Sequence, residues 1–209
     1  MRSIRCCLIG FALVLVSCGG GSSSSGSDAS STPTVTGAEV VYKVGDTGPG
    51  GGIIVYVDEA GFDNSSGVDT SIGSMCLTGT CHYLEMASTD LEGEYSSAPK
   101  GSFSWDEAIL AAEAFFTVSA DDWLLPSKDA LNVICKYAFQ DEIYEICNDN
   151  GMGGLSPVRG GFDIPGPGTG YWSNDEPGET AGRMQDFYFG FQYSQPKSAW
   201  YRVRPIRSF

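Results

Sequence analysis

Residues 121–132 read DDWLLPSKDALN, and this stretch predicts a short buried strand that leads into a capped helix. Pro126 ends an extended run, and the hydroxyl of Ser127 can accept hydrogen bonds from free N–H groups of the first helical turn. Asp129 lies where the helix dipole favours an anion. Trp123 and the two leucines after it are too large and apolar for a surface loop, so we expect them in the core.

The helix that starts here should run to about residue 139, because apolar residues from Leu131 to Ala138 recur at helical spacing. A second helix is predicted over residues 104–116, where Ser104 and Glu107 form a capping box. Strands are expected at residues 40–45, 52–58, 82–87, 170–173, 187–191 and 200–206. This order predicts an α+β domain in which two helices pack on a twisted antiparallel sheet with long loops.

The N-terminus has the parts of a bacterial lipoprotein signal peptide over residues 1–17. Arg2 and Arg5 make its start positive, and the apolar run that follows is too short to span a bilayer. Residues 15–18, LVSC, resemble a lipobox whose cysteine becomes the new N-terminus. The resemblance implies a diacylglycerol thioether on Cys18 and an acyl chain such as palmitate on its amine, which would anchor the protein to a membrane. An ordinary signal peptide is the alternative.

Residues 18–38 are expected to be the lipidated cysteine and a flexible tether, because Gly, Ser and Thr dominate up to Thr36 and leave almost nothing to bury. Gly19, rather than an aspartate, follows the cysteine. In a double-membraned bacterium this pattern is typical of lipoproteins sent to the outer membrane and the cell surface. Residues 39–209 are then expected to form one folded domain.

Acidic residues dominate the chain, which has 26 of them against 12 basic ones and a formal net charge of −14. Loss of residues 1–17 would remove two arginines and no acid, which leaves 10 basic residues and a net charge of −16. Such a surface argues against nucleic acid as a partner and against adsorption to anionic lipid. It is compatible with cation binding or basic partners, although simple solubility is the commonest reason for it.

Four cysteines remain once the signal peptide and Cys18 are set aside, and an even number in an exported chain predicts two disulfides. They are Cys76, Cys81, Cys135 and Cys147. Three pairings are possible, and Cys76–Cys81 with Cys135–Cys147 is favoured because each bond closes a local loop. The alternative is a metal site made of Cys76, Cys81 and His82, although adjacent Cys81 and His82 are poorly placed to bind one ion.

Residues 46–51, DTGPGG, lie between the first two predicted strands. A phosphate-binding loop would require a Lys-Ser/Thr pair or a helix start after the glycines, and neither follows. We therefore predict a turn in which the glycines supply positive φ angles.

Four stretches together resemble one bacterial family. They are VGDTGPGGGIIVY at residues 44–56, DWLLPSKDALN at 122–132, YWS at 171–173 and VRPIR at 203–207. They look like the Lcl C-terminal-like domain, named for the end domain of a bacterial collagen-like adhesin, over about residues 40–209. The resemblance implies a C-type-lectin-like fold, distantly similar to sulfatase-modifying-factor domains. The adhesin also implies binding of sulfated polysaccharide, but the high negative charge argues against that ligand here.

An oxidase of the formylglycine-generating type is the enzyme that this resemblance allows. Its chemistry depends on copper-binding cysteines near the C-terminal end of the domain, and no cysteine follows Cys147 here. The only histidine, His82, lies beside a predicted disulfide, so a Ser/His/Asp triad is not convincing. We expect no enzymatic activity.

Calcium is the one cofactor for which the sequence offers a candidate site. Residues 174–178, NDEPG, resemble the Glu-Pro-Asn motif of calcium-dependent lectins, and Asn174, Asp175 and Glu176 would supply oxygen ligands. The match departs at Gly178, where the family has an amide. Polar turn chemistry is the alternative explanation.

Basic and aromatic residues near the C-terminus could bind a ligand. If Arg202, Arg204 and Arg207 share a face, they could hold a carboxylate or a sulfate through paired N–H groups. Internal pairing with the many acidic side chains is the alternative. A sugar-stacking surface could form from aromatic residues that otherwise fit a core. These are Tyr171, Trp172, Tyr188, Tyr193, Trp200 and Tyr201.

These patterns predict a lipid-anchored surface protein whose non-enzymatic domain binds a glycan or a protein outside the cell. The alternative is an envelope structural or assembly protein that uses the domain to dock a neighbour.

Overall fold

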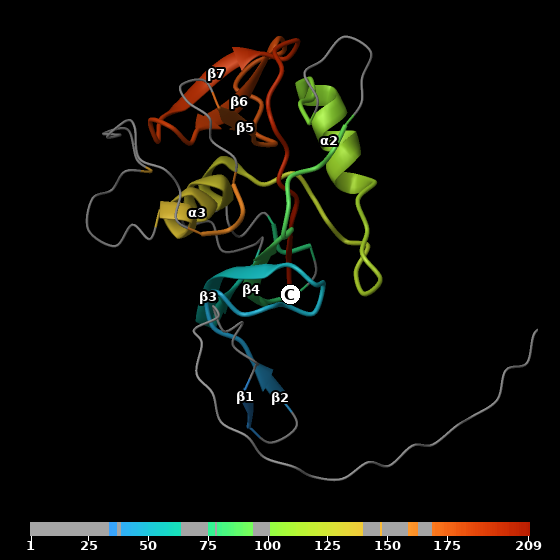
Figure 1. Cartoon of the computed structure of the whole chain (residues 1–209), viewed down its shortest axis with the longest axis vertical. Coiled ribbons are helices and arrows are strands. Elements are labelled where there is room, and N and C mark those ends of the chain that lie inside the picture. Colours follow the sequence, from blue (N-terminus) through green and yellow to red (C-terminus); the bar gives the residue numbers. More distant parts are fainter. Residues whose placement is uncertain are drawn as a thin grey trace, which may run out of the picture.

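A computed structural model gives the fold and describes residues 34–36, 39–63, 75–77, 79–93, 101–139, 147, 159–162 and 169–209. This part of the chain contains two helices and two three-stranded antiparallel sheets (Figure 1), so the predicted α+β class is confirmed. The predicted signal peptide and Cys18 lie outside the described residues. No helix in the described ranges is long and apolar enough to cross a bilayer.

A short hairpin precedes the two sheets. In it, β1 (Thr34–Thr36) pairs antiparallel with β2 (Glu39–Val41). The segment predicted to be a flexible tether therefore includes a short strand at residues 34–36. The physical reason is local, because the Gly- and Ser-rich composition gives way here to Thr and Val, whose branched side chains favour extended backbone.

The first three-stranded sheet brings the two ends of the domain together. Its strands are β3 (Ile53–Phe62), β4 (Cys81–Met86) and β8 (Ile206–Ser208), in the order β3-β4-β8. The carbonyl oxygen of Phe209 accepts hydrogen bonds from the N–H groups of His82 and Tyr83 at 2.8 and 3.0 Å. The Phe209 ring also lies 5.8 Å from the ring of Tyr42, which fixes the C-terminus beside the start of the domain.

The second sheet contains β5 (Gly170–Trp172), β6 (Ala181–Asp186) and β7 (Gln192–Pro196). A strand was predicted at residues 187–191, and this prediction is wrong because these residues form the turn between β6 and β7. The Asp186 carboxylate accepts hydrogen bonds from the N–H groups of Tyr188 and Phe189 at 2.8 and 3.2 Å, and Gly190 has a φ of 82°. The turn preferences of Asp186 and Gly190 therefore outweigh the strand preference that the alternating aromatic residues indicated.

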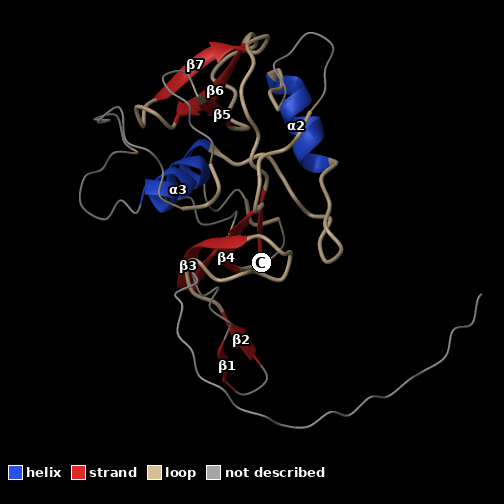
Figure 2. Cartoon of the chain, viewed as in Figure 1, coloured by secondary structure: helices blue, strands red, loops and turns tan. Residues whose placement is uncertain are grey.

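Helix α3 (Lys128–Phe139) lies between the two sheets (Figure 1, Figure 2). Its buried Leu131 and Ile134 belong to one core cluster with Leu84 of β4 and Tyr171 of β5. The predicted cap is present, because the N–H of Ala130 donates to the Ser127 hydroxyl at 3.2 Å. Burial against both sheets places this helix at the centre of the domain.

Helix α2 (Trp105–Glu113) packs against the second sheet and closes a separate core cluster. The predicted capping box is confirmed, since the Glu107 carboxylate accepts the N–H of Ser104 at 2.9 Å. Trp105 packs with Trp172 in this cluster. The helix ends at Glu113, three residues before the predicted end, and an exposed loop follows it (Figure 2).

Both favoured disulfides form, Cys76–Cys81 and Cys135–Cys147. The first joins the segment before β4 to the first residue of β4, and the second holds Cys147 against α3. A metal site at Cys76, Cys81 and His82 loses its two thiolates because the sulfurs are bonded to each other. His82 instead places Nδ1 3.0 Å from the carbonyl oxygen of Asp58.

Candidate functional site

The glycine turn at residues 46–51 surrounds a buried carboxylate. Glu85 of β4 has no exposed surface, and its two oxygens accept the N–H groups of Gly52 at 2.6 Å and Gly50 at 3.1 Å. The turn itself is confirmed by the hydrogen bond from the N–H of Gly51 to the carbonyl oxygen of Gly48 and by the positive φ of Gly51. Its N–H groups therefore bind an internal anion of the protein.

Arg207 supplies the positive charge that neutralises the buried Glu85 carboxylate. Its Nη1 donates to Glu85 at 3.0 Å, while Nε and Nη2 donate to the two oxygens of Asp122 at 2.6 and 3.0 Å. Burial alone would lower the pKa of Arg207, but the hydrogen bonds to Asp122 and Glu85 outweigh it and raise the pKa. A carboxylate without water requires such partners, and the Glu85 network supplies two amides and one guanidinium.

The glycines of this turn are required for close approach as well as for conformation. A Cβ at Gly48 would lie 2.4 Å from the carboxyl carbon of Glu85, and one at Gly52 would lie 2.2 Å from the backbone oxygen of Met86. A Cβ at Gly50 would lie 2.9 Å from the ring of Trp123, which is 1% exposed, as predicted for a core residue. Any larger residue would push the turn off the carboxylate.

A second buried network is centred on Arg204, which has no exposed surface. Its Nε donates to Asp90 at 2.6 Å, and Nη1 donates to the carbonyl oxygens of Ala87 and Gly160 at 3.1 and 2.8 Å. Its guanidinium also lies 4.1 Å from the centre of the Phe162 ring. This Asp90 network ties the end of β4 to residues 159–162 and to the last segment of the chain.

Asp90 has two further partners in this network. It accepts a hydrogen bond from the hydroxyl of Tyr171 at 2.9 Å and one from Nη1 of Arg202 at 3.4 Å. Burial, the Asp90 charge and this hydrogen bond raise the pKa of Tyr171 well above its ordinary value of 10.0, although Arg204 and Arg202 oppose the shift. Tyr171 therefore acts as a neutral hydrogen-bond donor inside the fold.

The predicted arginine cluster is thus divided between two internal acids. Arg202 and Arg204 contact Asp90, and Arg207 contacts Glu85 and Asp122. Trp172, the predicted aromatic partner, is fully buried and its Nε1 donates to the carbonyl oxygen of Phe103 at 2.8 Å. Trp172 and Arg204 therefore present no side chain to a ligand in this structure, which differs from the prediction.

The predicted calcium ligands are engaged in other contacts. Asp175 accepts the N–H of Lys128 at 2.5 Å and so caps α3 together with Ser127. Glu176 forms an ion pair with Lys197 at 2.5 Å. Asn174 lies beside them with an exposed side chain. Within the described ranges, no group of three or more His, Cys, Asp or Glu side chains could hold a metal ion, and calcium binding stays a prediction.

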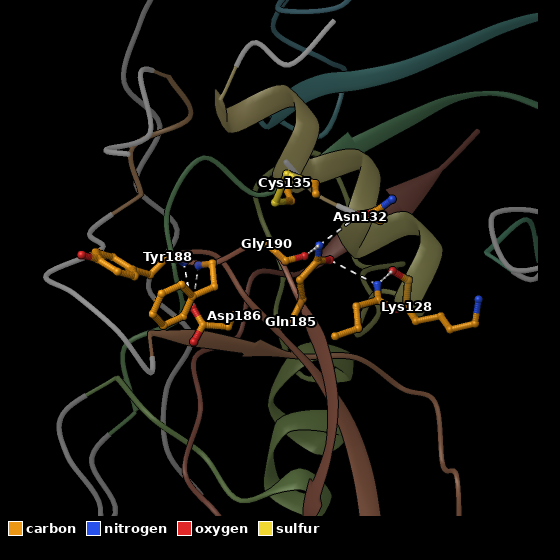
Figure 3. The surroundings of a disulfide bond; sticks show 10 residues. Lys128, Asn132, Cys135, Gln185, Asp186, Tyr188 and Gly190 are labelled. Carbon is orange, nitrogen blue, oxygen red and sulfur yellow. Dashed lines mark hydrogen bonds between the residues drawn. A yellow bond between two sulfur atoms is a disulfide. The ribbon is translucent and has the colours of Figure 1, made fainter. Parts of the chain in front are cut away.

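Sequence reasoning missed a partly buried amide cluster that joins the second sheet to α3 (Figure 3). The Nε2 of Gln185 donates to Asn132 at 2.9 Å and to the carbonyl oxygen of Gly190 at 3.1 Å. The Nε2 of Gln192 donates to the carbonyl oxygen of Lys128 at 2.7 Å and to Gln185 at 3.3 Å. These groups satisfy one another, and nothing in the sequence pattern pairs residues so far apart.

The remaining candidate site is a surface depression of about 560 Å³ beside the N-terminus of α2. One aromatic ring, one amine, two carboxylates and several hydroxyls line it. They belong to Ser104, Asp106, Glu179, Thr180, Lys197, Ser198 and Trp200. Asp106 and Glu179 are exposed and make no hydrogen bond or ion pair with the described residues, so they are available to an external donor.

Lys197 forms a fixed wall of this depression. Its Nζ lies 4.2 Å from the centre of the Trp105 ring and contacts the Glu176 carboxylate. Its backbone carbonyl also accepts the N–H of Trp105 at 2.9 Å. Only Trp200 of the residues that line the depression was a candidate from the sequence, because the other polar residues carry no distinctive spacing.

Comparison of the chain with protein-family models and with curated proteins gave no match.

Proposed function

We propose that this protein is an exported, lipid-anchored and non-enzymatic binding protein, and that its domain binds a carbohydrate in the depression lined by Trp200. The observation on which the proposal rests is that one partly exposed indole, the carboxylates of Asp106 and Glu179 and several hydroxyls line a single hollow. Concave sites with an apolar surface and a few polar groups are typical of small-molecule binding. A pyranose ring would stack on the indole and donate hydroxyl hydrogens to Asp106 and Glu179.

Export is supported by the chemistry of the cysteines. The domain contains two disulfides, and such bonds persist in oxidising compartments. The signal peptide and the lipidation of Cys18 belong to this proposal, as do the C-type-lectin-like fold and the kinship with the Lcl C-terminal-like domain. Placement at the outer membrane or cell surface is also part of the proposal, and Gly19 after the cysteine supports it for a double-membraned bacterium.

The buried networks support a binding role without catalysis. Two carboxylates of the core are used inside the fold, since Glu85 binds Arg207 and Asp90 binds Arg204. A general acid or base must instead reach its substrate.

A glycan array tests the carbohydrate proposal, with the mature chain carrying Cys18→Ser to remove the proposed lipid. We expect specific binding that Trp200→Ala weakens by about tenfold or more, because a central aromatic anchor contributes most of the binding energy. Tyr193→Ala is the matched control, since this tyrosine is 41% exposed and lies outside the depression. Arrays with and without Ca²⁺ test the calcium prediction. Absence of glycan binding, or equal loss in both variants, would contradict the proposal.

A further inference from the structure

The loop at residues 114–121 exposes apolar side chains that the fold does not use. Phe116 is 74% exposed and Val118 is fully exposed, and both line one hollow. In Figure 1 the loop continues from the end of α2 and lies at the edge of the molecule, at the level of the first sheet. Large apolar groups gathered in this way on a surface typically mark an interaction site.

The loop is held in a defined shape. The N–H of Thr117 donates to the carbonyl oxygen of Ala120 at 2.8 Å, and the N–H of Ala120 donates back to the Thr117 hydroxyl at 3.1 Å. At its base, the ring of Phe115 packs edge-on against the buried Trp123 with 5.3 Å between centroids. Asp122 is fixed by Arg207. A partner would therefore meet a preformed surface, which lowers the entropy cost of binding.

Charge identifies the kind of partner. The loop forms a hollow of about 600 Å³ together with Glu113, and the charged residues that line it are Glu113 and Asp121. Both carboxylates are exposed and make no ion pair with the described residues. An anionic bilayer and a second copy of this chain, with its formal net charge of −14, would both be repelled. A protein surface that carries apolar groups and positive charge would complement both the apolar side chains and the two carboxylates of the loop.

We propose that the 114–121 loop is a docking surface for a protein partner that presents apolar side chains flanked by lysine or arginine. The apolar groups of the partner would cover Phe116 and Val118, and its cations would pair with Glu113 and Asp121. This surface shares no residue with the carbohydrate depression, so one ligand can bind at each. The proposal does not depend on the proposed carbohydrate function.

Fluorescence anisotropy with two labelled helical peptides tests this proposal. One peptide is built from Leu and Lys, and the other has the same Leu positions with Glu in place of Lys. The disulfide-bonded full chain carrying Cys18→Ser should bind the Leu/Lys peptide about tenfold more tightly or better. Added salt should weaken that binding. Equal binding of both peptides, or no binding, would overturn the proposal.

Pairs of variants distinguish binding at the 114–121 loop from nonspecific attraction of a basic peptide to an acidic protein. Phe116→Ser with Val118→Ser should weaken Leu/Lys peptide binding by about tenfold. Val44→Ser with Leu77→Ser removes comparable exposed groups elsewhere and should change it by less than about twofold. Glu113→Gln should reduce affinity by about two- to threefold, whereas Glu59→Gln should not.

Two further measurements address other occupants of the loop. Vesicles of phosphatidylcholine, with and without phosphatidylglycerol, are floated with the same Cys18→Ser chain, and sedimentation velocity measures self-association. We expect neither flotation nor a dimer. Flotation or a dimer that is lost in the Phe116→Ser, Val118→Ser variant would replace the proposed partner with a membrane or with a second copy.

Discussion

The two buried arginine networks use the same side chain in opposite ways. In the Glu85 network a fully buried carboxylate is the central charge, and Arg207 and two backbone N–H groups surround it. In the Asp90 network the arginine is fully buried, and an acid that is 16% exposed and backbone carbonyls surround it. In each network the backbone groups match the buried charge, since N–H groups surround the carboxylate and carbonyl oxygens surround the guanidinium.

The largest expected effect breaks the first network. Arg207→Met leaves Glu85 as a buried charge with only the two glycine N–H groups, so we expect a loss of about 3–5 kcal/mol in the free energy of unfolding. Adding Glu85→Gln should recover about 1–2 kcal/mol, because the neutral side chain removes the buried charge and its one amide oxygen can still accept the N–H of Gly52. Urea unfolding measures both variants.

The Asp90 network supplies the control for that rescue. Arg204→Met should also destabilise strongly, but Asp90→Asn should not restore it, because Asp90 is partly exposed and keeps Tyr171 and Arg202 as partners. Equal rescue in the two networks would show that they do not differ in the way described.

A substitution in the glycine turn tests whether the Glu85 network also depends on close packing of the backbone. Gly52→Ala should cost about 1–3 kcal/mol, because its Cβ would lie 2.2 Å from the carbonyl oxygen of Met86, a backbone atom that cannot easily move. Gly178→Ala is the matched control, since nothing lies within 4 Å of a Cβ there, and it should be nearly neutral. Thermal unfolding of both variants measures the contrast.

Alkaline pH should reduce the stability that the Asp90 network contributes through Tyr171. Its pKa is raised on folding, so the stabilisation is fully present below the unfolded value near 10 and is lost as pH rises toward the folded value. Each pH unit above about 10 should cost up to about 1.4 kcal/mol per such tyrosine. Tyr171→Phe should make the fall in unfolding temperature between about pH 9 and 11 less steep. An unchanged slope would contradict this assignment.

The smallest expected effects are at the helix caps. Glu107→Ala removes the local partner of Ser104 in α2, and Asp175→Ala removes the distant cap of α3, each at a cost of about 1 kcal/mol. Asp175→Ala should also loosen the loop before β6, since Asp175 anchors that loop to α3. Hydrogen exchange should show faster exchange at residues 174–180 in Asp175→Ala only.

Local patterns accounted for the elements that depend on neighbouring residues. The capping box of α2, the start of α3 at Ser127 and the burial of Trp123 followed from spacing and side-chain type. The disulfide pairing followed from loop length. The strand predicted at residues 187–191 failed because Asp186 and Gly190 favour a turn, an effect weaker in the pattern than the three phenylalanines.

The candidate site was harder to predict, since it depends on residues far apart in the chain. The depression brings Asp106 of α2 to Glu179 and Trp200, and no periodicity links these positions. The arginines had the stronger sequence signal, but their partners Glu85 and Asp90 lie more than a hundred residues away. Whether a cation faces water or an internal acid is a property of packing.

The amino-acid pattern was enough to predict the α+β class, the two helices, their local caps, the glycine turn and the two disulfides, because each depends on backbone preference or short loops. Only the folded structure shows that the glycine turn binds Glu85, that Arg204 is buried, and that Trp200 and Phe116 lie at the surface. Burial and charge pairing depend on contacts between segments that are far apart in the sequence, and the spacing of residues along the chain does not specify those contacts.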